Sequence, residues 1–183
     1  MRRKTEREAI ERLMQLLGRR ARSAGTIYFT GGASAVLLGW RDMTLDIDLK
    51  LAPEPEGVFG AIHDAKEELG INIELAAPDD FIPAVPGWEA RSQFIVRVGP
   101  VEFRHYDFYG QALSKIERGH TQDAKDVEAM LERKLIEPGK LRDYFEAILS
   151  QIERYPALDA DAFRRKLNDA LAGCSKSDPS DVG

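Results

Sequence analysis

The sequence has a single cysteine, Cys174, among its 183 residues, so it has no partner for an internal disulfide. Nothing in its cysteine usage points to an oxidising compartment. No apolar run approaches the ~18 residues that a membrane-spanning helix needs, and the N-terminal segment has no apolar stretch like that of a secretion signal. These absences predict a cytoplasmic protein without a membrane partner.

The chain as a whole also has no excess of basic over acidic residues. The formal net charge of -5 argues against a protein that coats nucleic acid non-specifically. Residues 2–22 are the exception, because basic side chains outnumber acidic ones there. Such a helix fits either a solvated face or a surface that touches phosphate backbones, and the first reading is favoured.

The hydrophobic share of 43% and the charged share of 31% are those of a globular protein, and the length fits one domain with or without a helical annex. The pattern predicts an α/β (α+β) core over residues 1–106, a helical bundle over 107–172 packed against it, and a disordered tail over 173–183. The core is expected to contain a short mixed sheet.

Local patterns place the elements of the core. The capping box Thr5-x-x-Glu8 predicts a helix over about 5–22. Alternation and β-branched residues predict strands over 26–30, 45–49 and 71–75 and a hairpin over 93–98 and 101–106. Helices are predicted over 33–39 and 58–69, the second ending at Gly70. The prolines of 76–88 predict an irregular loop.

The C-terminal half is expected to be helical throughout. Apolar periodicity predicts helices near 108–118, 121–135, 139–154 and 160–172. Pro138 and Asp159 are the start signals of the last two.

Gly31-Gly32 lies between a predicted strand and a predicted helix. Glycines let a ligand approach the backbone closely, and the helix N-terminus behind them favours an anion such as phosphate. Ser34 is placed to add a hydroxyl donor. The segment therefore predicts a phosphate-binding loop.

Asp46 and Asp48 lie two apart on the next predicted strand, so their side chains project from one face. Two neighbouring carboxylates repel each other unless a cation lies between them. Hard oxygen ligands suit Mg²⁺ or Mn²⁺, which bind substrate phosphates as well. The histidines His63, His105 and His120 are not spaced as metal ligands and are expected to be structural, and no Ser-His pairing is visible in the sequence.

The block Phe29, Thr30, Gly31, Gly32 followed by Asp46-Ile47-Asp48 resembles the signature of the DNA polymerase beta-like nucleotidyltransferase superfamily. This resemblance implies a third carboxylate from a later strand. Glu74 sits where that topology would put it, and Glu102 and Asp107 are the fallback candidates. The implied metal ligands are Asp46, Asp48 and Glu74.

A second block, from Tyr106 to Val127, is similar to the helical block of abortive-infection-type nucleotidyltransferase toxins and their uncharacterised bacterial relatives. The resemblance implies that Lys115 contacts nucleotide phosphates with Arg118 one turn beyond, and that Asp123, with Asp126 in the same motif, helps to orient the site. This chain is shorter than the toxins and lacks their large extra domain, so toxicity and acceptor identity do not carry over.

Together these features predict a nucleotidyltransferase that uses a nucleoside triphosphate and Mg²⁺. Gly31, Gly32 and Ser34 would cradle the phosphates. The acceptor (tRNA, a protein or a small molecule), the nucleotide and the oligomeric state stay open. Two alternatives also stay open: a non-catalytic nucleotide-binding module, and a nucleic-acid interaction protein that uses the basic helix.

Overall fold

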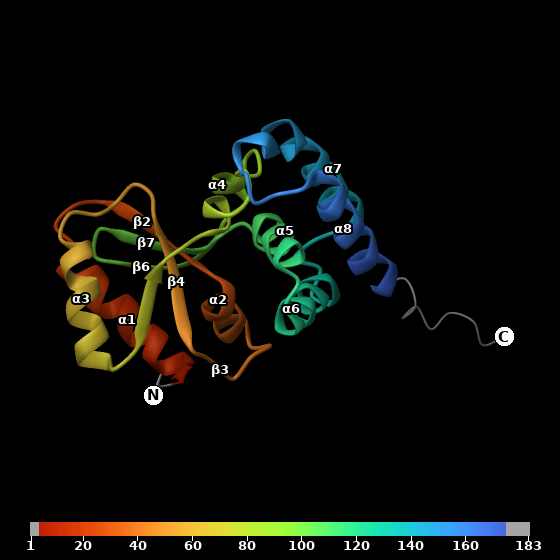
Figure 1. The fold of residues 1–183 in the computed structure, drawn as a ribbon. Helices are drawn as coiled ribbons and strands as arrows, with labels where there is room; N and C mark the ends of the chain where they lie inside the picture. Colours follow the sequence, from red (N-terminus) through yellow and green to blue (C-terminus); the bar gives the residue numbers. More distant parts are fainter. Residues whose placement is uncertain (1–3, 175–183) are drawn as a thin grey trace. The chain divides into compact units, whose positions relative to one another are not determined.

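The computed structural model describes residues 4–174 and divides into two compact units (Figure 1). We call the first the sheet unit; it comprises the chain up to Asp80 together with Gly87–Asp107. The second, the helical unit, comprises Phe81–Pro86 and the chain from Phe108 onward. The segment Phe81–Pro86 comes from the predicted irregular loop, and the sequence did not assign it to the helical half. The predicted tail lies outside the described residues from 175 onward.

The sheet unit is built on a five-stranded mixed sheet in the order β5-β4-β2-β7-β6. Its strands are β2 (Gly25–Thr30), β4 (Asp46–Leu51), β5 (Asn72–Leu75), β6 (Gln93–Val98) and β7 (Val101–His105). Strand β2 runs antiparallel to β4 and parallel to β7, while β4 and β5 are parallel and β6 and β7 form the predicted hairpin. The mixed α/β fold class is therefore confirmed.

One face of this sheet is apolar because the strands alternate. Ile27, Phe29, Ile47, Leu49 and Ile73 are buried in the core. Helices α1 (Arg7–Arg20) and α3 (Val58–Leu69) contact each other and cover this face (Figure 1). The residues between these positions, among them Asp46 and Asp48, therefore belong to the other face.

Helix α2 (Gly31–Leu38) begins directly at the end of β2 and ends at Gly39 in the left-handed conformation. It therefore includes Gly31 and Gly32, which were predicted to precede a helix over 33–39. The chain then forms β3 (Met43–Thr44), which pairs with β1 (Thr5–Glu6) in a separate two-stranded ribbon. The capping box predicted at Thr5 is therefore wrong. Thr5 is buried in the ribbon opposite Thr44, and α1 starts only at Arg7.

The predicted irregular loop contains two short elements. They are η1 (Pro78–Asp80), a single 3-10 turn, and α4 (Trp88–Arg91). Both belong to the sheet unit.

The helical unit contains α5 (Phe108–Arg118), α6 (Thr121–Glu132), α7 (Pro138–Ile148), the 3-10 segment η2 (Leu149–Arg154) and α8 (Ala160–Cys174). Pro138 occupies the first turn of α7, as predicted. Asp159 caps α8, since its Oδ1 accepts a hydrogen bond of 2.6 Å from the Ala162 amide. The unit packs around residues such as Phe145 and Phe163, whose ring centroids lie 4.9 Å apart. Within residues 4–174, none of the helices has the length and apolarity needed to cross a bilayer.

Candidate active site

Asp46 and Asp48 project from the polar face of the sheet. Ile47 between them and Leu49 after them are essentially inaccessible to solvent, at 0% and 1% exposure, which fixes the direction in which β4 alternates. Both aspartates are half-buried. The predicted arrangement, two acids on one face of a strand, is what the structure shows.

Asp48 lies beside the glycine pair. The register of β2 and β4 places Thr30 opposite Asp48. Because Gly31 follows Thr30, the carboxylate reaches the start of α2, and its Oδ2 lies only 3.0 Å from where a Cβ on Gly31 would be. The structure thus brings together an acid and a glycine that are 17 positions apart in the chain.

The two glycines are required for different reasons. Gly31 has a φ of +58°, in the left-handed region that favours glycine. Gly32 is buried, and a Cβ there would lie 2.1 Å from the Thr44 hydroxyl and 3.2 Å from a guanidinium nitrogen of Arg41. Neither Arg41 nor Thr44, which lies in the two-residue strand β3, was predicted at this position, because so short a segment gives no periodic signal.

Glu74 stands on the strand next to the acid pair. The parallel register of β4 and β5 pairs Asp46 with Asn72 and Asp48 with Glu74, so all four side chains share one face. The Asn72 amide nitrogen donates to Asp46 Oδ1 at 2.7 Å and to Glu74 Oε1 at 3.0 Å. Asn72 was also missed, although its place two residues before Glu74 puts it on the same face.

The two fallback carboxylates are engaged with arginines. The Arg91 guanidinium binds Asp107 through two contacts of 3.1 and 2.7 Å, and Asp107 is buried. Hydrogen bonds from Arg104 and Arg97 lower the pKa of Glu102 below its usual range. These geometries favour Glu74 over Glu102 and Asp107 as the third acid.

Ser34 does not face the phosphate side of the loop. Its side chain is fully buried, and its hydroxyl donates to the Phe29 carbonyl at 3.1 Å and lies 2.9 Å from His105 Nδ1. This corrects the sequence-based position of Ser34. It also reveals a Ser-His contact that the sequence did not show, and burial lowers the pKa of His105 to about 4. At 0% and 5% exposure, the pair fastens α2 to β7 inside the core.

An aromatic cluster lies farther along the polar face. Trp88 stacks on Tyr106 with ring centroids 4.6 Å apart and meets Tyr28 edge-on at 5.0 Å. The Lys50 ammonium lies 5.6 Å from the Trp88 ring and pairs with Asp79 at 2.6 Å. Trp88 therefore packs against other side chains of the sheet unit.

The residues of the second sequence block form one charged cluster inside the helical unit. Lys115 is buried and contacts Asp126 at 2.6 Å and Asp123 at 3.3 Å. Arg118 binds Asp123 at 2.6 and 2.8 Å. Burial raises the pKa of Asp123, but hydrogen bonds and charge from Arg118 and Lys115 outweigh it, so the pKa lies below its usual range. The structure brings the predicted Lys115, Arg118 and Asp123 together as mutual ion pairs.

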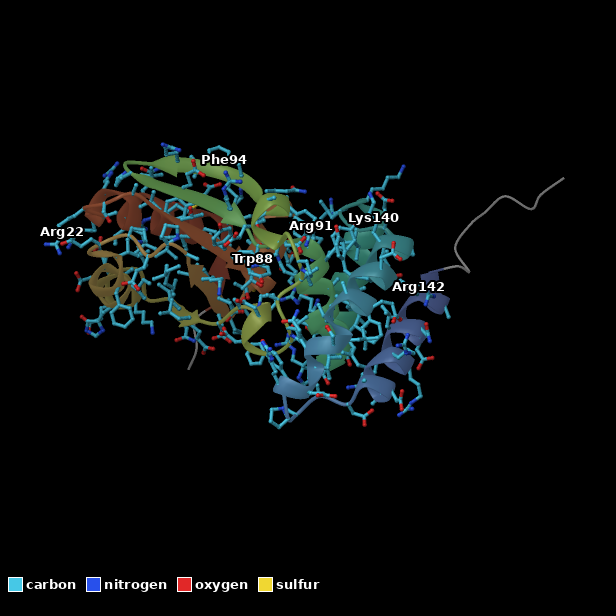
Figure 2. The ribbon with its side chains drawn as sticks, turned by 90° about the horizontal axis from the view of Figure 1, so that it is seen from above. Arg22, Trp88, Arg91, Phe94, Lys140 and Arg142 are labelled. Atoms are coloured by element: carbon cyan, nitrogen blue, oxygen red, sulfur yellow. The ribbon has the colours of Figure 1, made fainter. Side chains whose placement is uncertain are left out.

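Acids elsewhere in the sheet unit pair with arginines of the basic N-terminal segment. Arg20 pairs with Asp64 and Arg22 with Glu56, and Figure 2 shows Arg22 at the end of the sheet unit away from Trp88. A groove of about 770 Å³ along α1, α3 and β6 is lined by equal numbers of arginines and glutamates: Arg12, Arg19, Arg20, Glu8, Glu11 and Glu68. This mixed charge does not favour a phosphate-backbone surface.

Within residues 4–174, no three His, Cys, Asp or Glu side chains are gathered closely enough to hold a metal ion by themselves. A magnesium site does not require three protein ligands. Mg²⁺ commonly binds through one or two carboxylates and completes its shell with water and substrate phosphates. The pair Asp46 and Asp48 is compatible with that mode.

Comparison with protein families found a match over most of the chain. A family model described as "Nucleotidyltransferase of unknown function (DUF6036)" matches residues 7–170. Searches of curated proteins and of solved structures found no match. The matched range includes both the carboxylate face and the buried charge cluster.

Proposed function

Because the chain belongs to this family of nucleotidyltransferases of unknown function, we propose that it moves a nucleotidyl group from a nucleoside triphosphate to an acceptor hydroxyl, with Asp46 and Asp48 holding Mg²⁺. The observation that carries the proposal is the approach of the Asp48 carboxylate to Gly31. It joins an acid pair to the N-terminus of a helix at the end of β2. Phosphates and a divalent cation are the ligands that these two groups prefer.

The donor set fits Mg²⁺ chemically. Asp46, Asp48 and Glu74 supply only hard oxygen donors, and all three lie on one sheet face. When bound, the ion neutralises charge on the triphosphate and favours its cleavage. Mn²⁺ takes the same oxygen ligands and is the natural substitute in binding experiments.

The chain's own groups position the substrate. Gly31 would let the phosphates approach the backbone, whereas the space beside Gly32 is filled by Thr44. The N-terminus of α2 favours the negative charge of the phosphates. Asp46 and Asp48 would hold the cation that neutralises the triphosphate. Glu74 is the candidate to accept the acceptor's proton or to complete the cation's shell.

The reaction balances as a substitution at phosphorus. The acceptor oxygen forms a bond to the α-phosphorus, the bond from that phosphorus to the bridging oxygen of the β-phosphate breaks, and pyrophosphate leaves. The acceptor loses its proton. Rate enhancement in such chemistry comes mainly from positioning and charge stabilisation.

The predicted phosphate contacts of Lys115 and Arg118 and the predicted orienting role of Asp123 do not enter this proposal. Their charges balance within the helical unit, because Lys115 and Arg118 face Asp123 and Asp126. Such a cluster is accounted for by the packing of α5 against α6.

The test is transfer of label from α-³²P-labelled nucleoside triphosphates, supplied as a panel with Mg²⁺ and with tRNA, protein or small-molecule hydroxyls as acceptors. The double variant Asp46→Asn, Asp48→Asn should lower transfer by more than about a hundredfold, since loss of even an indirect metal contact costs ten- to a hundredfold. It should keep its fold, because removing like charge from a half-buried pair relieves repulsion.

Asp64→Asn is the matched control, since Asp64 is an exposed aspartate on α3 whose ion pair with Arg20 is also exposed. Equal transfer by the double variant and this control would overturn the proposal. Mg²⁺-dependent nucleotide binding without pyrophosphate release would instead support the non-catalytic binding module.

A further inference from the structure

Asn72 bridges two of the three acids of the candidate site. Its amide nitrogen donates one hydrogen bond to Asp46 at 2.7 Å and another to Glu74 at 3.0 Å. The bridge is possible because β4 and β5 pair in register, with Asp46 beside Asn72 and Asp48 beside Glu74. The side chain is therefore aligned with the acids by the backbone ladder.

The chemistry of this bridge is specific to an amide. An asparagine NH₂ group carries two hydrogens, and here each one meets a different carboxylate. The two acceptors carry like charges that repel, so a shared neutral donor lowers the cost of holding them together. An aspartate of the same shape would add a further negative charge and lose both donors.

We propose that Asn72 is a positioning residue of the carboxylate site, which holds the Asp46 carboxylate in the orientation that binds the divalent cation together with Asp48. This inference rests on the proposed function. Loss of a hydrogen-bond donor that orients a metal ligand typically lowers metal affinity or activity by ten- to a hundredfold. Asn72 does not itself touch the reacting atoms.

Contacts other than those of the Asn72 side chain hold strand β5 in place. Strand β5 is held by its ladder with β4, and its core contact is Ile73, which is 1% exposed. Asn72 itself lies at the half-exposed edge of the sheet. Loss of its side chain should therefore have little effect on folding.

The decisive variant is Asn72→Leu, which has a similar volume and no donor. Mn²⁺ affinity of the full chain, measured without nucleotide by electron paramagnetic resonance of the free ion, should weaken about tenfold. In the transfer assay, the half-saturating Mg²⁺ concentration should rise about tenfold, and excess Mg²⁺ should restore the rate. Asn72→Gln, which keeps the amide, should recover part of the Mn²⁺ affinity.

Asn168→Leu is the matched control. Asn168 lies on α8 in the helical unit, where its Oδ1 accepts a hydrogen bond from Arg142 at 2.5 Å. This variant should leave Mn²⁺ affinity and Mg²⁺ dependence unchanged. A lower melting temperature of Asn72→Leu with unchanged cation binding would assign a structural role and overturn the inference.

The outcomes separate the two claims. If Asn72→Leu binds Mn²⁺ more weakly than the wild type and the wild type transfers no nucleotide, the role of Asn72 is supported and the transferase proposal fails. If the wild type is active and Asn72→Leu has the same Mn²⁺ affinity and Mg²⁺ dependence as the wild type, only the role of Asn72 is overturned. A wild type that neither binds Mn²⁺ nor transfers nucleotide overturns both.

Discussion

At the scale of single residues, His105 links stability to pH. Its pKa is about 4 in the folded state because of burial, against 6.5 in the unfolded chain. Above pH 6.5 both states hold it neutral, and as the pH falls from 6.5 to 4 only the unfolded state gains its proton. Folding stability therefore decreases over this window.

The expected loss between pH 7.5 and pH 5 is about 2 kcal/mol from His105 alone, since each pKa unit is worth about 1.4 kcal/mol. Urea unfolding at the two pH values measures it, with His105→Gln as the comparison that removes the titrating group. His63→Gln is the control, because His63 is exposed. An identical pH dependence in wild type and His105→Gln would contradict the assignment.

Gly31 is the residue that joins the proposed phosphate site to the acid pair. Replacing it with alanine forces a side chain into a φ of +58° and against Asp48 Oδ2 at 3.0 Å. The left-handed conformation should cost about 1–2 kcal/mol of folding stability. Displacing the carboxylate by a few tenths of an ångström should also lower transfer by about tenfold, because catalytic geometry tolerates little error.

Gly39→Ala is the matched control for this prediction. Gly39 also has a positive φ, of +83°, but a Cβ there would meet no atom of the described residues within 4 Å. The Gly39→Ala protein should lose as much folding stability as the Gly31→Ala protein, but it should keep the wild-type transfer rate. Equal activity losses in the two variants, measured as kcat, would show that strain in α2 and not the Asp48 contact is responsible.

At the scale of elements, the ion cluster joins α5 to α6. Lys115→Met would leave Asp126 with a reduced set of partners in a site where its side chain is 1% exposed. Breaking a buried ion pair from one side typically costs about 3–5 kcal/mol. Chemical denaturation should detect that loss, whereas Lys125→Met, at an exposed position of α6, should change little. A stable Lys115→Met protein that has lost nucleotide binding would instead support the role implied by the toxin resemblance.

Local patterns predicted the elements whose signals are complete within a few residues. Strand β4 alternates, and α3 has apolar periodicity and a glycine in the left-handed conformation at its end, Gly70. The ribbon of β1 and β3 was missed because it pairs Thr5 with Thr44, and such pairing depends on tertiary contacts rather than on local sequence. Thr5 fitted a capping box equally well by sequence alone.

The same distinction applies to the site. Gly31 and Asp48 were predicted from motif spacing, whereas the Asn72 bridge requires the register of β4 and β5. Ser34 was predicted to face the loop, but it lies on α2 and its side chain is buried. Helix α2 is apolar around most of its circumference, and such a helix is buried on several sides.

At the scale of the whole molecule, ligand binding and stability are linked. A ligand that binds only the folded protein stabilises it by about 2.7 kcal/mol at a concentration one hundred times its Kd. For a chain of this length, that corresponds to a rise in Tm of about 5–10 °C. A saturating Mg²⁺-nucleotide complex should therefore raise the Tm of the transition that unfolds the sheet unit.

Calorimetry with a non-hydrolysable triphosphate measures this shift without turnover. The Asp46→Asn, Asp48→Asn variant should show little or no shift, and Mg²⁺ or nucleotide alone should give a smaller one than both together, because each completes the other's binding site. Because the acids lie in the sheet unit, a helical unit that unfolds separately would give a second transition unaffected by the ligand. An equal shift in wild type and double variant would place the nucleotide elsewhere on the protein and contradict the carboxylate site.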